Sequence, residues 1–423
     1  MPIDKVLLRN RPFLFLWGGQ TASVLGSQFS AIAFPVLAVT LLGASEWEMG
    51  LLNAFDNAAF LLVGLPAGAW VDRWRKRKVL ISADIVRAIA VGVLPVLWFM
   101  DMLAIWHLFV SGFVIGVATV FFDVSYQSYL PHIVDHSLLG PANSALETTN
   151  QISRTGGPAV VGILVDILSA PVLIIADAIS FVLSAIALRA IPDDEHPIAK
   201  DERRSLRTEI AEGLRFVFHQ PVIRRVVINV TLTNFSYTLM ATLLPLLILR
   251  DLGISATLYG VMMSAASVGG LLGAVATTPI VKRIGEGPVV VLSAAIGAIA
   301  SIFMPLAAYV ERPTAVGILI ASEFVFMFTV LTYNITQVSA RQRLCPPELL
   351  GRMNASIRFF VWGVMPLGAV AAGALGAALG LVTTMWLGAI GHVLAALVMV
   401  ISPLWGMRYI APPAERQEAS AGK

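Results

Sequence analysis

Long apolar stretches alternate with short polar loops along the whole chain. A helix needs about 20 apolar residues to cross the hydrocarbon core of a bilayer, and twelve stretches meet that length closely enough to be read as spans. Several contain proline or glycine, which neighbouring helices accommodate within a membrane. The predicted spans are 13–42, 49–70, 79–100, 105–126, 145–168, 172–188, 226–249, 258–281, 289–309, 315–337, 353–379 and 383–404.

Composition agrees with this pattern and excludes a soluble fold. The 423 residues are 57% hydrophobic and only 13% charged, whereas soluble chains carry roughly 25% charged residues. The net charge of +3 comes from basic residues in the short loops, so it indicates membrane topology rather than nucleic-acid binding. The single cysteine excludes an intramolecular disulfide.

The basic residues fall on one side of the predicted membrane. Of the 29 Lys and Arg residues, 24 lie in the termini and loops on the side that holds both chain ends. Only Arg250 and Arg312 lie in loops on the opposite side. By the positive-inside rule, both termini are cytoplasmic.

The chain repeats itself at an offset of 210 to 211 residues. Apolar helices match by chance, so the informative matches are those of glycine, proline and asparagine. The pairs are Pro35 and Pro245, Gly43 and Gly253, Gly50 and Gly260, Asn143 and Asn354, Gly157 and Gly368, and Gly162 and Gly373. The repeat predicts an all-α membrane protein of twelve transmembrane helices in two six-helix pseudo-symmetric bundles, residues 1–190 and 221–423. The polar stretch 191–220 joins them and carries apolar residues on one helical face, which predicts an amphipathic helix on the cytoplasmic membrane surface.

Two local motifs make the architecture specific. The loop Gly68-Ala-Trp-Val-Asp72-Arg73-Trp-Arg-Lys-Arg77 and the span-five segment Gly157-Pro158-Ala-Val-Val-Gly162 resemble the loop and antiporter motifs of the major facilitator superfamily. Arg75 and Val161 replace one glycine in each motif. Together with Glu212-Gly-Leu-Arg-Phe-Val and Gly351-Arg-Met-Asn354, they resemble the efflux branch that includes macrolide exporters and the enterobactin exporter. The resemblance implies a secondary transporter of the bacterial plasma membrane, monomeric, driven by a proton gradient and without a cofactor.

The same resemblance implies roles for the two motifs. The loop motif, with Gly68, Asp72, Arg73, Arg77 and Asp123, would form a cytoplasmic gate latch; the alternative is a set of surface charges that fixes topology. The span-five motif, with Gly157, Pro158 and Gly162, would seal the cavity against leak; the alternative is simple helix packing.

Ionisable residues within the spans are the candidates for proton coupling or substrate binding, because placing them in a bilayer is costly. Asp56 lies near the middle of span two and could take up a proton at one face and release it at the other; the alternative is a static ion pair with a buried arginine. Arginine keeps its charge, so Arg154 would compete with the proton for Asp56 or hold an anionic substrate. Arg358, in span eleven at the repeat position of Glu147, is a further candidate. Glu323 and Asp177 are the remaining carboxylate candidates.

No phosphate-binding loop, metal-ligand spacing or nucleophile motif appears in the sequence. We therefore expect a transporter rather than an enzyme. Its expected partners are a small-molecule substrate, protons and the lipid bilayer, and no nucleic acid. The favoured hypothesis is a proton-coupled exporter of amphipathic small molecules, such as drugs or siderophores, that works by alternating access. The alternatives are an uptake permease of the same fold and a non-transporting membrane sensor or scaffold.

Overall fold

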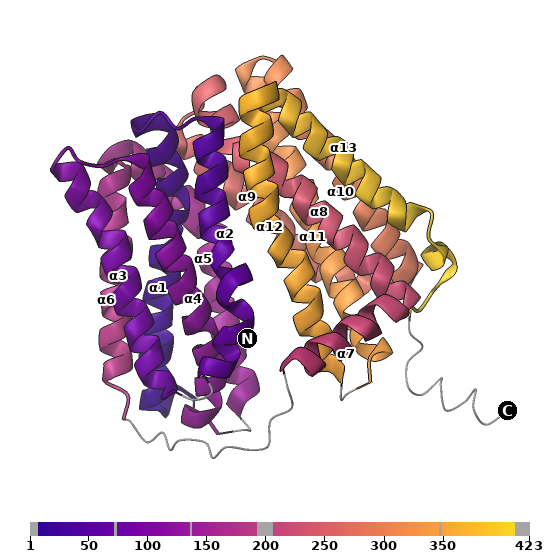
Figure 1. Cartoon of the computed structure of the whole chain (residues 1–423), viewed down its shortest axis with the longest axis horizontal. Helices are drawn as coiled ribbons and strands as arrows, with labels where there is room; N and C mark the ends of the chain where they lie inside the picture. Colours follow the sequence, from indigo (N-terminus) through magenta and orange to yellow (C-terminus); the bar gives the residue numbers. More distant parts are fainter. Residues whose placement is uncertain (1–6, 72–73, 136–137, 193–205, 347–348, 411–423) are drawn as a thin grey trace. The chain divides into compact units, whose positions relative to one another are not determined.

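The computed structural model describes residues 7–71, 74–135, 138–192, 206–346 and 349–410. In these residues the regular structure is helical throughout. The first repeat contains α1 (Arg11–Val36), α2 (Glu46–Val71), α3 (Lys76–Phe99), α4 (Ile105–Ile133), α5 (Leu139–Leu168) and α6 (Ala170–Arg189). The second contains α8 (Pro221–Pro245), α9 (Ala256–Ile284), α10 (Glu286–Leu306), α11 (Arg312–Leu344), α12 (Leu350–Leu379) and α13 (Leu381–Val400), and α7 (Leu206–His219) precedes it (Figure 1).

Each of the twelve predicted spans coincides with one long helix. Within the part of the chain that the structure describes, ten of these helices are long and apolar enough to cross a membrane. The other two are α2 and α5, and α5 is more polar because it contains Glu147, Arg154 and Asp166. The predicted fold class, twelve transmembrane helices in two related sets of six, is confirmed.

The repeat found in the sequence recurs in the helix boundaries. At an offset of 210, α2 and α9 begin at residues 46 and 256, and α3 and α10 begin at 76 and 286. At an offset of 211, α6 and α13 match at both ends, 170–189 and 381–400. The glycine and proline matches in the sequence therefore correspond to a repeat in the structure.

A local irregularity after the first helix of each repeat shows the same relationship. Pro35 and Pro245 are followed by π-helical turns, Leu37–Leu41 and Leu246–Asp251. A proline lacks an N–H donor and its ring crowds the preceding turn, which favours a local change of hydrogen-bond register. A glycine with positive φ lies two residues after the end of each turn, 61° at position 43 and 57° at position 253, a conformation that glycine adopts without strain.

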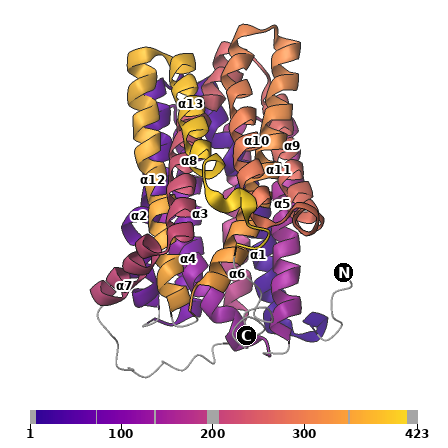
Figure 2. The ribbon, with the colours of Figure 1, turned by 90° about the vertical axis from the view of Figure 1, so that its right-hand side faces the viewer.

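The contacts between helices divide the chain into two compact units. Unit 1 contains residues 1–201 and 245–264, and unit 2 contains residues 202–244 and 265–423. In unit 1, α6 packs on α1 and α3, and α4 packs on α2 and α3. In unit 2, α10 packs on α11 and α13 (Figure 2). The segment 245–264 of the second repeat thus makes its contacts with helices of the first; the domain boundaries drawn from the repeat, at 190 and 221, remain a prediction.

The predicted amphipathic helix of the linker is α7, and it packs against α12. Val217 is fully buried in a cluster with Met353 and Ile357 of α12. Glu212 accepts a hydrogen bond from Arg352 in an ion pair. Part of the apolar face of α7 therefore contacts protein, which a pattern of apolar positions cannot distinguish from contact with lipid.

Candidate functional site

A buried ion pair lies inside unit 1, on α3. Arg87 donates to Asp84 one turn earlier in the same helix. Asp84 is 0% exposed and Arg87 is 5% exposed. The guanidinium also lies 4.2 Å from the ring centroid of Phe122 and 4.5 Å from that of Phe181, close enough for cation–π attraction. The positive charge of Arg87 is thus balanced by the carboxylate of Asp84 and by two aromatic rings.

A second carboxylate faces the same arginine from α6. Asp177 is 1% exposed and accepts hydrogen bonds from Ser30 of α1 and, at 3.3 Å, from Ser180. Arg87 interacts electrostatically with Asp177 and with Asp123 of α4. We call Asp84, Arg87 and Asp177 the charged cluster; it joins side chains of α3 and α6 that lie far apart in the sequence.

Glycines bring α1 close enough to α6 to form this cluster. A Cβ atom at Gly26 would lie 1.9 Å from the Ser180 hydroxyl oxygen and 2.9 Å from the Asp177 Oδ1 atom. A Cβ at Gly19, two turns earlier, would lie 3.2 Å from the Cα of Ser184. Small residues two turns apart allow this close approach in membrane helices. Gly19 and Gly26 of α1 were not predicted as site residues, although their spacing of two turns was visible in the sequence.

Asp56 lies in α2 at the contact with α4. Its side chain is exposed, while its backbone lies against α4, where a Cβ at Gly116 would come within 2.9 Å of the Asp56 carbonyl oxygen. Arg154 of α5 is also exposed. Among the described residues no ion pair joins the two, so the proposed competition between Arg154 and a proton at Asp56 remains a prediction.

The span-five motif lies in a tight helix contact within unit 1. A Cβ at Gly157 would come within 2.5 Å of Gln28 of α1. A Cβ at Gly162 would come within 2.8 Å of the carbonyl oxygen of Ala256 and 3.0 Å of the Cα of Gly260 in α9. Nearby, the Ala159 amide donates to the Ser264 hydroxyl at 2.8 Å. Glycine at these positions is therefore required by packing.

Of the residues predicted for the cytoplasmic latch, Arg77 of α3 and Asp123 of α4 have described side chains. Asp72 and Arg73, and the surroundings of Gly68 in α2, lie outside the described residues. Arg77 donates to the carbonyl oxygens of Leu188 at 3.0 Å and Arg189 at 2.6 Å. Both carbonyls belong to the last turn of α6, beyond the regular i→i+4 hydrogen bonds of the helix, so Arg77 ties the start of α3 to the end of α6. The latch itself remains a prediction.

Unit 2 contains a buried carboxylate of its own. Glu323 of α11 is 2% exposed, and within the described part of the chain its Oε1 atom has no hydrogen-bond partner. One turn later, the Phe326 ring stacks on Tyr237 of α8 at 4.6 Å and meets the edge of His392 of α13 at 5.5 Å. These three rings line a cavity of about 220 Å³. The remaining candidate, Arg358, is exposed on α12 with its guanidinium 5.5 Å from the Trp362 ring.

Comparison with known proteins assigns the chain to a family. Residues 16–369 match the sequence model of the Major Facilitator Superfamily, and the chain belongs to that superfamily. It is 27% identical over 402 residues to the multidrug efflux pump Tap of Mycolicibacterium fortuitum, covering 92% of this chain and 95% of Tap. It is 23% identical over 237 residues to macrolide efflux protein A of Streptococcus pyogenes, covering 56% of this chain and 58% of that protein.

A solved structure supports the fold assignment. The inward-facing structure of a bacterial homologue of the iron transporter ferroportin is similar with a TM-score of 0.75 at 16% identity, over 93% of this chain and 98% of that one. At this identity the similarity concerns the fold alone. The chain is therefore a multi-pass membrane transporter of small molecules with relatives named as drug efflux pumps, and the resemblance to the efflux branch is confirmed. Within the described residues, no three His, Cys, Asp or Glu side chains gather as metal ligands.

Proposed function

We propose that this protein is a proton-coupled exporter of amphipathic small molecules that works by alternating access. The observation that carries the proposal is the presence of carboxylates buried inside both units, Asp84 and Asp177 in one and Glu323 in the other. Ionisable groups inside membrane helices are costly and mark ion or proton pathways. The nearly full-length similarity to a multidrug efflux pump supports export rather than uptake.

The two kinds of buried carboxylate suggest a division of roles. Asp84 and Asp177 share a permanently charged arginine, so a proton that reaches either one changes the charge balance around Arg87. Glu323 lacks such a counterion among the described residues, and a carboxylate in apolar surroundings without a partner is a natural proton carrier. The favoured sequence of events is protonation from outside, release inside and outward movement of the substrate.

The membrane orientation follows from the basic residues. Both termini, the loop between α2 and α3 and the linker carry the Lys and Arg excess, which places them in the cytoplasm by the positive-inside rule. The membrane is then the plasma membrane of a bacterium. The protein acts as a monomer with protons, lipid and a small molecule as its partners, needs no cofactor other than the proton gradient, and binds no nucleic acid.

Transport by purified protein in liposomes tests this function. An imposed proton gradient should drive accumulation of a fluorescent amphipathic cation such as ethidium, or of a macrolide, and a protonophore should abolish it. Glu323→Gln and Asp177→Asn should each remove the gradient-driven part. Accumulation that is the same with and without a gradient would show that protons are not coupled to transport.

A matched substitution controls for general damage. Asp101 lies in the turn between α3 and α4 with φ of 55°, a conformation that asparagine tolerates. Asp101→Asn removes the same charge outside the bundle and should leave coupled transport unchanged. Equal loss in Asp101→Asn and Glu323→Gln would argue against a specific proton site.

A further inference from the structure

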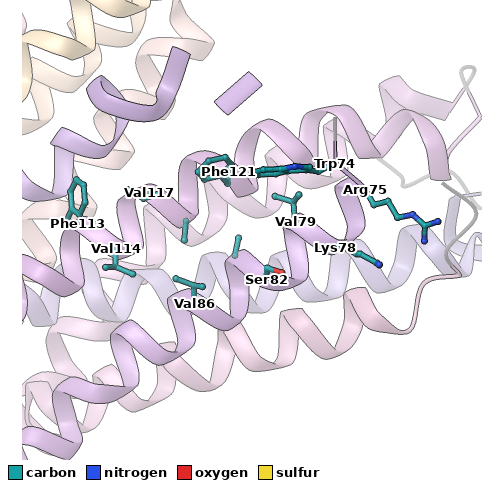
Figure 3. Close-up of a pocket in the computed structure, with 12 residues that line it drawn as sticks. Trp74, Arg75, Lys78, Val79, Ser82, Val86, Phe113, Val114, Val117 and Phe121 are labelled. Atoms are coloured by element: carbon teal, nitrogen blue, oxygen red, sulfur yellow. The ribbon is translucent and has the colours of Figure 1, made fainter. Parts of the chain in front are cut away.

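A groove on the surface of unit 1 combines apolar walls with a basic end. It lies between α3 and α4 and has a volume of about 710 Å³ (Figure 3). Its floor and walls are made largely of small and aromatic apolar side chains, including Val79, Val86, Val117 and Phe121. This volume is within the usual range for small-molecule sites, roughly 300–1,000 Å³.

Two cations mark one end of the groove. Arg75 and Lys78 line it at the start of α3 and both are exposed. In Figure 3 they project from the same end of the groove, on the far side of Trp74 from Phe113. The single polar side chain further along that line of residues is Ser82 of α3. The groove is thus amphipathic along its length.

Aromatic rings lie next to the basic end of the groove. Trp74 is 50% exposed, and its ring packs on Trp70 at 6.5 Å and on Phe121 at 6.0 Å. Tryptophan is enriched at the level of lipid headgroups. This preference supports a position of Arg75 and Lys78 near the lipid phosphates, with the apolar part of the groove directed toward the hydrocarbon.

The length of the groove matches part of one leaflet. Lys78 and Val86 are eight residues apart on α3, about 12 Å at 1.5 Å per residue. One leaflet of the hydrocarbon core is about 15 Å thick. A chain of methylene groups that begins at the phosphate level and runs along the groove would therefore be covered by it over most of its depth.

We propose that this groove binds one anionic phospholipid, with the phosphate at Lys78 and Arg75 and an acyl chain along α3 and α4. The positive charges of Arg75 and Lys78 attract an anionic headgroup more strongly than a neutral one. The apolar walls select a lipid over free phosphate, which would occupy only the basic end. This site is independent of proton coupling and of the direction of transport.

Lipid binding to the full-length chain tests the proposal directly. The purified protein is titrated with phosphatidylglycerol or with phosphatidylcholine of the same acyl chains, and bound lipids are counted by native mass spectrometry. We expect one phosphatidylglycerol to be retained preferentially. Lys78→Gln should weaken its binding about fivefold, the change that one basic residue near an anionic surface makes, and Lys78→Gln with Arg75→Gln should weaken it further.

The second repeat supplies a matched charge control. Lys282 and Arg283 are exposed in the last turn of α9, and position 283 is the repeat counterpart of position 73. Lys282→Gln with Arg283→Gln removes the same charge and should leave phosphatidylglycerol binding unchanged. Equal retention of the two lipids, or an equal loss in the control pair, would overturn the proposal.

Two further measurements separate the acyl chain from the headgroup. Val86 is an exposed groove residue, so Val86→Trp should fill the groove and reduce retention of phosphatidylglycerol while Lys78 and Arg75 are kept; Ser82→Phe provides a second filling variant if the first does not fold. Inorganic phosphate at millimolar concentration should not displace the lipid. Full displacement by phosphate, or unchanged binding in both filling variants, would show a phosphate site without a lipid groove.

Discussion

The carbonyl oxygen of Pro158 faces the Cα of Gly260, and a Cβ atom at Gly260 would lie only 2.3 Å from that oxygen. The two residues come from different repeats, on α5 and α9, yet both belong to unit 1. Gly162 lies on the other side of the same contact, since the Cβ of residue 260 would also come within 2.9 Å of its Cα. Backbone thus meets backbone, and neither partner has a flexible side chain that can move away.

The first prediction concerns Gly260→Ala. The added methyl group cannot be accommodated without a shift of α5 against α9, and overpacking of this kind costs about 1–3 kcal/mol. Thermal unfolding of the purified protein should therefore occur at a lower temperature, and transport should fall. Gly156→Ala is the control, because no atom lies within 4 Å of its Cβ position; it should leave the stability unchanged or raise it by up to about 1 kcal/mol, the usual gain from alanine over glycine within a helix. Equal effects of the two variants would show that the contact is not tight.

The second prediction concerns the buried ion pair of Asp84 and Arg87. Arg87→Leu leaves a buried carboxylate without its main counterion, and Asp84→Leu leaves a buried guanidinium; each should lower the free energy of unfolding by about 3–5 kcal/mol. The double variant removes both charges and should be less destabilised than the sum of the two singles. A double-mutant cycle measured by thermal or denaturant unfolding gives the coupling energy, which should exceed about 1 kcal/mol. Additive effects would mean that the two groups do not interact.

The third prediction uses the only cysteine of the chain as a reporter of the linker helix. Cys345 is buried in the cluster that includes Val217 of α7 and Met353 of α12. Val217→Asp places a carboxylate in this cluster and should release α7, so maleimide labelling of the native protein should become faster. Arg215→Asp introduces the same residue at an exposed position of the same helix and should leave the labelling rate near that of the parent chain. Fast labelling of the parent itself would contradict the packing of α7 on α12.

Much of the fold could be predicted from the sequence because the membrane imposes a simple pattern. Apolar length alone placed twelve helices, and the matched pairs Pro35 with Pro245 and Gly43 with Gly253 revealed a repeat that the helix boundaries reproduce. These residues are informative because proline and glycine have backbone requirements that few other residues satisfy. Aligned leucines carry no such information.

The partners of the charged residues could not be predicted in the same way. Arg87 lies on α3 and Asp177 on α6, and no sequence pattern links the two residues, but the structure brings them within electrostatic range. The contact between α1 and α6 depends on small residues such as Gly26, because a larger side chain there would collide with Ser180 and Asp177. The sequence does not show which helix faces such a glycine. Ser30 was not predicted as a partner of Asp177 because a lone serine in a span has no distinctive pattern.

The last prediction separates a functional carboxylate from a structural one. Glu323 is buried with an oxygen that no described residue satisfies, and a buried polar group without its hydrogen bonds costs about 1–3 kcal/mol. Glu323→Leu should therefore keep or raise the unfolding temperature while it removes proton-driven accumulation, as expected when a group is retained for function at the expense of stability. Gln337→Leu is the control on the same helix: Gln337 is also buried, but it donates to Asn334 at 3.4 Å and accepts from Arg341 at 3.5 Å, so its loss should destabilise the protein. If Glu323→Leu destabilised the chain as much as Gln337→Leu, Glu323 would have a structural partner, and its assignment as a proton carrier would lose its physical basis.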